Sequence, residues 1–355
     1  MNGKNLIAAA CAAVSTTAFA QSSVTLSGVA DAAVRYVTSS GRGHVVSLAN
    51  GGNSTSRIQL RGVEDLGGGL SASFTLESGI NLDNGSIAGN FFDRESHVSL
   101  NSSTWGSVRL GRDYTSVYRN WGARYDPFNQ VGVGLMGNLY NANTNGPIRA
   151  AFGTDPNTLV RASNSVQYFI PPIVRGLEAT VMYSFDERQP ATAGAHKWVG
   201  GRVNYNFGSF AVGAATSQVK NSRTAGEHLT DSSVGAVYNA GGMRLSAVVR
   251  QASFLASKQR LTTLGFLYIT GPHEFKASYG RMDVSGTVGA ASVDANDASQ
   301  VALGYVYKLS KRTALYATAA QIRNKGQAAQ VISGGPGVTP GTAITGTEFG
   351  LRHAF

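Results

Sequence analysis

The side chains that most often perform acid–base or nucleophilic chemistry are scattered along this chain. The single cysteine, Cys11, lies near the N-terminus, which excludes disulfides, thiolate metal sites and thiol catalysis in the rest of the chain. A Ser/His/Asp-type hydrolase is recognised by geometry rather than by chain order, and no nucleophile motif accompanies the histidines. We therefore expect no enzyme activity and no cofactor. The histidines are His44, His97, His196, His228, His273 and His353.

One short segment resembles half of a calcium-binding loop. Asp294-Ala295-Asn296-Asp297 has the alternating acidic and amide side chains of such a loop but lacks its glycine and its terminal glutamate. A solvated surface loop explains the segment better, so we predict no metal site.

The elements that must position the remaining polar residues are β-strands. Apolar and polar residues alternate, as in Val24 to Asp31, Ile58 to Arg61 and Val199 to Tyr205, which is the period-two signal of a strand with two different faces. Ile58 and Leu60 share one face, so Arg57, Gln59 and Arg61 share the other. No segment has a convincing long helical period.

About sixteen such segments are predicted, and their connections alternate in length. Short ones include Gly67 to Gly69 and Ala240 to Gly242, where glycine supplies the positive φ of tight hairpins; long polar ones include Tyr114 to Val160 and Lys325 to Thr345. The segments begin near Ser23, Thr55, Leu70, Phe92, Gly106, Ser163, Leu177, Lys197, Phe210, Thr230, Met243, Lys258, Glu274, Ala298, Thr313 and Gly346.

Residues 1–20 are predicted to be an export signal. Lys4 gives the positive start, Leu6 to Val14 is apolar, and Ala18-Phe19-Ala20 is a cleavage site that leaves a mature domain of residues 21–355. The chain carries 30 basic and 20 acidic residues, a formal charge of +10. The basic residues are dispersed and the protein is exported, so we expect no nucleic-acid partner.

Together these features predict an all-β, sixteen-stranded antiparallel transmembrane barrel. Hydrocarbon cannot hydrogen-bond an open sheet edge, so spanning strands must close into a barrel. Long loops at one end and tight turns at the other are typical of outer-membrane barrels. The alternative, a soluble β-sandwich or a passenger domain, does not explain the alternating loop lengths or the terminal aromatic residue.

The sequence resembles the trimeric general porins of Gram-negative bacteria, especially the beta-proteobacterial branch. The resemblance extends along the whole mature chain and implies a homotrimer of sixteen-stranded barrels in the outer membrane, each narrowed by an inward-folded third loop. The segments that carry it are Gln21 to Leu26, Ser56 to Gly67, Phe74 to Gly79, Gly106 to Tyr114, Asp126 to Phe128, Asn164 to Tyr168 and Gly350 to Phe355.

The resemblance implies that Arg57, Arg94 and Arg161 form a cluster on the wall of the pore constriction. For Arg57 the alternation agrees, because an arginine facing lipid at mid-depth costs about 2–4 kcal/mol. For Arg94 it agrees poorly, and the alternative for all three is an ordinary solvated lumen residue. The third loop, Tyr114 to Val160, should face this wall, with Asp126 pointing into the pore; Pro127 makes a purely structural turn the alternative.

Further positions are implied by the same resemblance. Arg112 is expected near the subunit interface, under a neighbour's second loop, with an ion pair to Asp113 or Glu95 as the alternative. Phe349, Leu351 and Phe355 resemble the C-terminal signal read by the barrel assembly machinery, the alternative being an ordinary last strand.

The implied function is a passive, water-filled channel for small hydrophilic solutes and inorganic ions, surrounded by outer-membrane lipid. Three arginines at about 10 Å contribute about 1.2 kcal/mol toward anions before salt screening. That indicates a mild anion preference. The alternative is a channel with a dedicated anionic substrate, such as phosphate or an organic acid, which would show saturable block.

Overall fold

The computed structural model describes residues 23–154, 159–185 and 197–355. The predicted export signal, with the mature end at Gln21, lies outside these residues. Antiparallel strands form most of the described residues. Their bounds are β1 Ser23–Ser39, β2 Gly43–Asn50, β3 Arg57–Gly67, β4 Leu70–Gly79, β5 Glu95–Ser102, β6 Gly106–Tyr114, β7 Arg161–Phe169, β8 Leu177–Ser184, β9 Lys197–Phe207, β10 Phe210–Lys220, β11 Leu229–Ala240, β12 Met243–Phe254, β13 Ser257–Thr270, β14 His273–Val288, β15 Ala291–Ser292, β16 Ala298–Lys308, β17 Thr313–Asn324 and β18 Ala343–Ala354.

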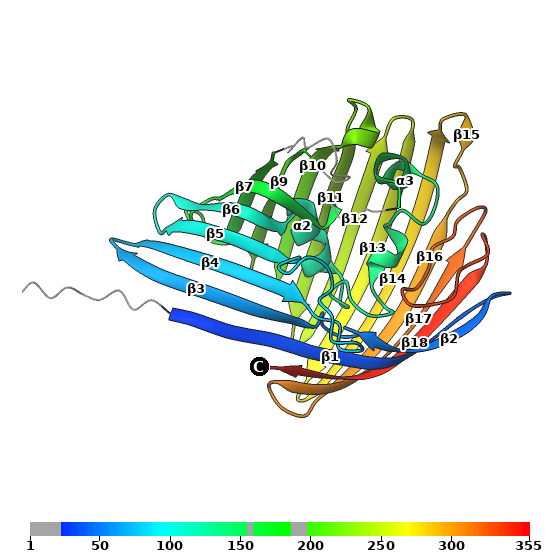
Figure 1. The fold of residues 1–355 in the computed structure, drawn as a ribbon, viewed down its shortest axis with the longest axis horizontal. Helices are drawn as coiled ribbons and strands as arrows, with labels where there is room; N and C mark the ends of the chain where they lie inside the picture. Colours follow the sequence, from blue (N-terminus) through cyan, green and yellow to red (C-terminus); the bar gives the residue numbers. More distant parts are fainter. Residues whose placement is uncertain (1–22, 155–158, 186–196) are drawn as a thin grey trace, which may run out of the picture.

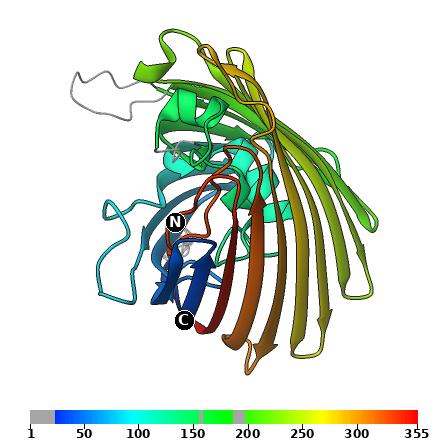
Figure 2. The same ribbon diagram turned by 90° about the vertical axis from the view of Figure 1, so that its right-hand side faces the viewer.

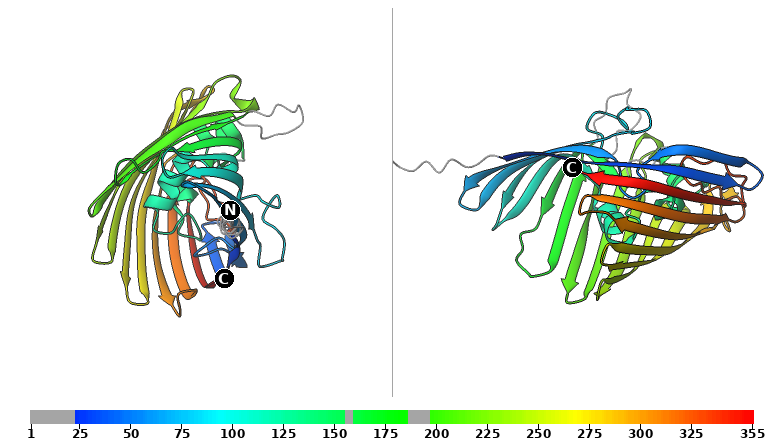
Figure 3. Two further views of the ribbon diagram at one scale, coloured as in Figure 1. Left: turned by 90° about the vertical axis from the view of Figure 1, so that its left-hand side faces the viewer. Right: turned by 90° about the horizontal axis from the view of Figure 1, so that it is seen from below.

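The strands close into a barrel, as Figures 1 and 3 show. Each wall strand pairs with its neighbours in sequence, and β1 pairs with β18 from Val29↔Ala354 to Ser39↔Ile344. The backbones of Gly28 and Phe355 exchange hydrogen bonds of 3.0 and 3.1 Å, which joins the two ends of the wall. Although the strands are numbered to β18, β2 and β3 share one wall position and β15 is a two-residue addition beside β14. The wall therefore has sixteen antiparallel strands, and the prediction is confirmed.

The sequence analysis missed β2. The first half of β1 pairs with β3 and its second half pairs with β2. Residues 51–56 interrupt this shared wall strand and turn into the barrel. There the carboxylate of Asp31 accepts hydrogen bonds from the backbone N–H groups of Gly52, Asn53 and Ser54, at 3.1, 3.1 and 2.6 Å. The interruption therefore has a specific anchor on β1.

The outer face of the wall is apolar. On β18, Phe349 is 60% exposed, whereas Glu348 beside it is 3% exposed and faces inward. Aromatic residues gather near the short turns, where the ring centroids of Phe207 and Phe210 are 5.9 Å apart and those of Phe210 and Tyr238 are 4.8 Å apart. Such an aromatic band is typical of the interface between lipid hydrocarbon and water.

The third loop folds into the barrel, as expected, and carries its own apolar core (Figures 1 and 2). Its described residues include short helices that the sequence analysis did not predict, namely α2 (Ser116–Tyr125), η2 (Met136–Leu139) and α3 (Pro147–Phe152). Helix α2 packs on β8 to β13, η2 on β14 and β16, and α3 on β11 to β13 and on η4 (Ser222–Thr224). The buried loop side chains include Trp121, Tyr125, Phe128, Val133, Met136, Leu139, Tyr140, Ile148 and Phe152.

Within the described residues, no helix has both the length and the hydropathy needed to cross a membrane.

Candidate functional site

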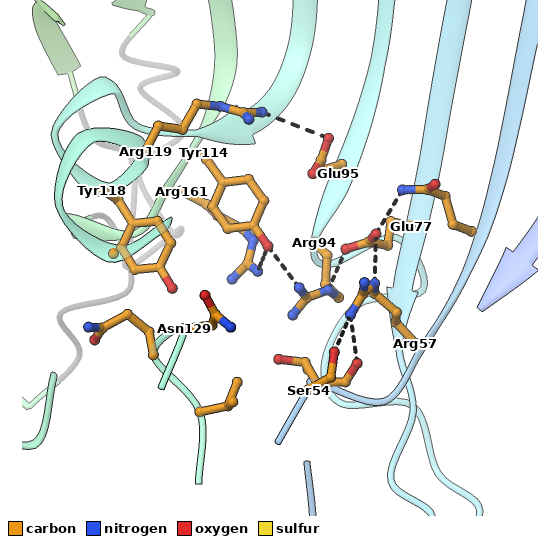
Figure 4. A pocket seen from close by; sticks show the side chains of 15 residues that line it. Ser54, Arg57, Glu77, Arg94, Glu95, Tyr114, Tyr118, Arg119, Asn129 and Arg161 are labelled. Atoms are coloured by element: carbon orange, nitrogen blue, oxygen red, sulfur yellow. Dashed lines mark hydrogen bonds and ion pairs between the residues drawn. The ribbon is translucent and has the colours of Figure 1, made fainter. Parts of the chain in front are cut away.

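The described part of the barrel interior contains a cavity of about 630 Å³ between the third loop and the wall from β3 to β7. Its lining is mostly polar. Four guanidinium groups and two carboxylates dominate it, namely Arg57, Arg94, Arg119, Arg161, Glu77 and Glu95 (Figure 4). The structure therefore brings together all three arginines that the resemblance placed on the pore wall.

Two of these arginines share one carboxylate. Nε of Arg57 lies 3.3 Å from Glu77, and Nε of Arg94 lies 2.5 Å from the other oxygen of the same group. Arg57 also donates to the Ser54 hydroxyl and to the Thr55 carbonyl, at 3.2 and 2.9 Å. Glu77 thus positions both guanidinium groups and cancels part of their charge.

Tyr114 joins Arg94 to Arg161. Its hydroxyl oxygen accepts a hydrogen bond from Nη2 of Arg94 at 2.7 Å and another from Nη2 of Arg161 at 2.8 Å. The guanidinium carbon of Arg161 lies 4.4 Å from the centre of the Tyr114 ring. The phenol holds two cations in place while remaining uncharged, so it leaves their charge in the cavity.

The fourth arginine comes from the loop rather than from the wall. Arg119 on α2 pairs with Asp113 on β6 and lies 3.9 Å from Glu95 on β5. Burial opposes its charge, but Asp113 and Glu95 outweigh burial and raise the pKa of Arg119. Thr115 caps the start of α2 by accepting a hydrogen bond from Tyr118 N–H, and this fixes the direction in which Arg119 leaves the wall.

Strand register explains how distant residues meet here. Tyr114 and Arg161 are paired as β6 ends and β7 begins, so they mark where the third loop leaves the wall and where it returns. Arg57 is paired with Gly79, two positions beyond Glu77 on the same face of β4. Arg94 lies just before β5 rather than on it, which explains why its surroundings alternated poorly in the sequence.

Asp126 requires a correction. It was expected to point into the pore, but it ends α2, is 4% exposed and is absent from the lining of this cavity. Its carboxylate accepts hydrogen bonds from the N–H groups of Phe128, Gln130 and Met136 and from the Gln130 amide. Burial raises the pKa of Asp126 to about 6, against these hydrogen bonds. The residue organises the turn inside the loop, as the structural alternative held.

Arg112 lies on the outer face of the barrel wall, away from the cavity. Strand register pairs it with Ser96, two positions from the outward-facing Val98. Its Nε donates to the Asp93 carbonyl at 2.7 Å and its Nη1 to the Ser163 hydroxyl at 2.8 Å. The alternative of an ion pair with Asp113 or Glu95 is not what the structure contains. Arg112 instead connects the end of the second loop to β7.

The terminal aromatic residues all face outward. Phe349, Leu351 and Phe355 are 60%, 49% and 47% exposed, and they lie on the lipid side of β18 and its end. Gly28 leaves room for the Phe355 ring, because a Cβ at that position would clash with it. The predicted alternation of this last strand is therefore present.

Several residues of the cavity were not singled out in the sequence as pore residues, among them Glu77, Tyr114 and Arg119. Glu77 could have been found, because Phe74 and Leu76 alternate with it and place its side chain inside, opposite Gln59 on the strand that Arg57 begins. Tyr114 and Arg119 could not, since one depends on a register shift after Gly111 and the other on a helix that has no long period.

Glu95, His97 and Asp113 are close enough to consider as metal ligands, since their ligand atoms lie within 4.8 Å of one another. The group already has cationic partners, however. Asp113 accepts from Arg109 at 2.5 Å and from Arg119, and His97 lies 3.2 Å from Glu95. Two guanidinium groups on these carboxylates disfavour a metal cation, so the cluster fits an ion-pair network.

Comparisons with known proteins agree with this geometry. Residues 8–327 match the Gram-negative porin family. Outer membrane porin protein 32 of Delftia acidovorans is 38% identical over 99% of both chains, and an outer membrane porin protein of Bordetella pertussis is 29% identical over 90% of this chain and 94% of its own. Among solved structures, an anion-selective porin from Comamonas acidovorans superimposes with a TM-score of 0.79 at 34% identity, over 94% of this chain and 100% of its own.

The closed barrel, the polar cavity beneath an inward-folded loop and these relatives lead to one assignment. The chain belongs to the Gram-negative porin family and is a porin of the bacterial outer membrane.

Proposed function

We propose that this porin is a general diffusion channel for small hydrophilic solutes and ions, with a mild preference for anions. One observation carries the preference: four guanidinium groups line the lumen cavity against two carboxylates. Two net charges at about 10 Å in water contribute about 0.8 kcal/mol, roughly a fourfold bias. Salt reduces this bias, since the Debye length is about 8 Å at physiological ionic strength.

The selectivity named for one relative supports the same proposal. The solved porin from Comamonas acidovorans is described as anion-selective, and it covers 94% of this chain at 34% identity. A channel with a dedicated anionic substrate remains the second candidate. It is favoured by a further group of arginines described in the next subsection.

The experiment is a reversal-potential measurement on the purified porin in a planar bilayer with a potassium chloride gradient. We expect a chloride-to-potassium permeability ratio of roughly four at 0.1 M salt, falling toward one at 1 M as the Debye length shortens to about 3 Å. A ratio below one at low salt would refute the anion preference.

We infer that the protein assembles as a homotrimer with Arg112 near the subunit interface. The support is the position of Arg112 on the outer face beside the second loop. A heat-modifiable trimer is expected in detergent electrophoresis, and Arg112→Gln should lower its dissociation temperature. A detergent-soluble monomer would contradict the inference.

We infer also that Phe349, Leu351 and Phe355 are read by the barrel assembly machinery. Their support is the outward face that they share on the last strand and at its end. Deleting Phe355 should reduce the amount of folded porin in the outer membrane more than it reduces refolding of purified chain in detergent. An equal loss in both would indicate an ordinary packing role.

A further inference from the structure

A second basic cavity lies on the far side of Arg119. It has a volume of about 370 Å³ and is lined by four guanidinium groups, with Asn206 and Asn239 among its neutral residues. Arg119 lines this cavity and the first one, so the two are adjacent. The four arginines are Arg119 and Arg124 from α2, Arg202 from β9 and Arg244 from β12.

The two cavities occupy different depths in the barrel. Arg57 begins β3 at the interruption of the wall strand shared with β2, midway along β1, and Arg161 begins β7 where the third loop rejoins the wall. Arg244 follows directly on the short turn between β11 and β12, and Asn206 stands beside the short turn between β9 and β10. A solute that enters from the long-loop end therefore reaches the first cavity before the second.

The second cavity has more positive charge than its carboxylate partners balance. Arg124 and Arg202 approach the same carboxylate, that of Glu178, each at 3.4 Å. Glu178 is 47% exposed in its side chain, so water weakens both pairs. Arg244 donates to the backbone carbonyl of Arg124, which carries no charge. Arg119 is the only one of the four with a buried carboxylate among the described residues.

The donors are also incompletely used. Nη1 of Arg124 donates to the Asn206 amide oxygen at 2.9 Å. In the described part of the chain, the buried Nε atoms of Arg119 and Arg202 have no hydrogen-bond partner. Buried donors without partners are uncommon because each costs free energy, so the hydrogen bonding of these two guanidinium groups is incomplete within the described residues.

The chemistry of guanidinium groups selects the ligand. Their planar forks match the oxygens of phosphate and carboxylate groups, and they hold charge at any physiological pH. The volume of the cavity equals that of about a dozen water molecules at roughly 30 Å³ each, which admits a small oxyanion together with some of its hydration water. Chloride, a single small ion, cannot use the fork geometry.

We propose that this second cavity is a binding station for small oxyanions, with inorganic phosphate as the simplest member. Arg119 passes an anion from the first cavity to Arg124, Arg202 and Arg244, and the anion leaves at the short-turn end. The inference rests on the proposed function, because the porin must first admit anions. It adds a saturable site to a channel that otherwise only sieves.

The test is block of chloride current by inorganic phosphate in planar bilayers that contain the full porin. The concentration that halves the chloride current is measured for the wild type and for Arg202→Gln/Arg244→Gln. Removing two charges next to a divalent anion should raise that concentration by roughly tenfold. Arg202→Lys/Arg244→Lys keeps the positive charges and removes the planar guanidinium groups, so we expect an intermediate rise in the half-blocking concentration. The lysine variant also tests the site if the glutamine variant folds poorly.

The matched control is Arg260→Gln. Arg260 is exposed and donates to Gln251, so its substitution removes one arginine charge outside both cavities and should leave the half-blocking concentration unchanged. An unchanged value in Arg202→Gln/Arg244→Gln, an equal rise in the control, or no phosphate block of the wild type would each overturn the second site. The reversal potential in potassium chloride, recorded on the same channels, tests the proposed function separately: anion preference without phosphate block removes the site alone.

Discussion

The guanidinium group of Arg161 lies over the ring of Tyr114, with its carbon 4.4 Å from the ring centre, and donates to the Tyr114 hydroxyl at 2.8 Å. The two residues are strand partners at the point where the third loop leaves and re-enters the wall. Arg94 donates to the same hydroxyl. A neutral side chain thus holds two positive charges together at the base of the loop, whereas a carboxylate there would cancel one of them.

Glu77→Gln should make the channel more anion-selective. Glu77 is the carboxylate that Arg57 and Arg94 share, so its neutral analogue removes one negative charge from the cavity and leaves a hydrogen-bonding group of the same shape. One charge at about 10 Å contributes roughly 0.4 kcal/mol, which about doubles the chloride-to-potassium permeability ratio at 0.1 M salt. The reversal potential measures it.

A control for Glu77→Gln is Glu64→Gln, since Glu64 is exposed on β3 and does not line the cavity. Its ratio should equal that of the wild type. A fall in the ratio for Glu77→Gln would mean that the arginines lose their positions when the carboxylate is removed.

Asp126→Asn should destabilise the loop and change the pH dependence of stability. An asparagine offers one acceptor oxygen where the carboxylate receives four hydrogen bonds, and an unmade buried bond costs about 1–3 kcal/mol. The pKa of Asp126 is about 6 in the folded protein, against an ordinary 3.8. The folded state therefore binds this proton more tightly than the unfolded chain does.

The direction of the pH dependence of stability follows from this difference in pKa between the folded and the unfolded chain. Proton binding by Asp126 stabilises the fold fully below about pH 4, and this contribution, at most about 3 kcal/mol, is lost as the pH rises through 6. In thermal unfolding in detergent from pH 3.5 to 7.5, the unfolding temperature of the wild type should rise relative to that of Asp126→Asn as the pH falls. A constant difference between the two proteins would show that Asp126 does not titrate in this window.

Arg250→Met should be strongly destabilising, because Arg250 on β12 and Asp231 on β11 form a buried ion pair on the wall, against which the third loop packs. Arg250 donates to both oxygens of Asp231, at 3.0 and 2.5 Å, and its guanidinium carbon lies 4.1 Å from the Tyr140 ring centre. Tyr140 also donates to Asp231 at 2.8 Å. Leaving a carboxylate buried without its cation costs about 3–5 kcal/mol.

The double variant Arg250→Met/Asp231→Asn distinguishes a lost ion pair from lost packing. It removes the unpaired charge, so its unfolding temperature in detergent should recover much of the loss seen in Arg250→Met. If the double variant is as unstable as the single one, the contribution of Arg250 is its contact with Trp121 and Tyr140 rather than its charge.

The strands of the wall were predictable, because the alternation of apolar and polar residues and the need to close the barrel apply to every strand. The predicted starts near Thr55 and Ser163 differ by two residues from the observed starts at Arg57 and Arg161, and one physical rule, apolar outward and polar inward, governs them all. The missed strand β2 follows a three-residue turn, Ser40 to Arg42, between the segments predicted to begin near Ser23 and Thr55.

The loop interior was not predictable in the same way. Helix α2 is short, and its residues are chosen by contacts with distant strands, so it carries no extended period. Asp126 is an example. Its position beside Pro127 predicted a turn, but the hydrogen-bond donors that surround its carboxylate, from Phe128 to Met136, depend on how the loop folds upon itself.

The reversal potential of Arg57→Gln/Arg94→Gln/Arg161→Gln across a potassium chloride gradient at 0.1 M tests the central claim most directly. The substitutions replace three of the four guanidinium groups of the first cavity and leave Glu77, Glu95 and Arg119 in place. Three charges at about 10 Å contribute about 1.2 kcal/mol, so the permeability ratio should fall about eightfold and the preference should reverse toward potassium. A reversal potential equal to that of the wild type, in a channel that still folds and conducts, would show that these arginines do not govern which ions pass.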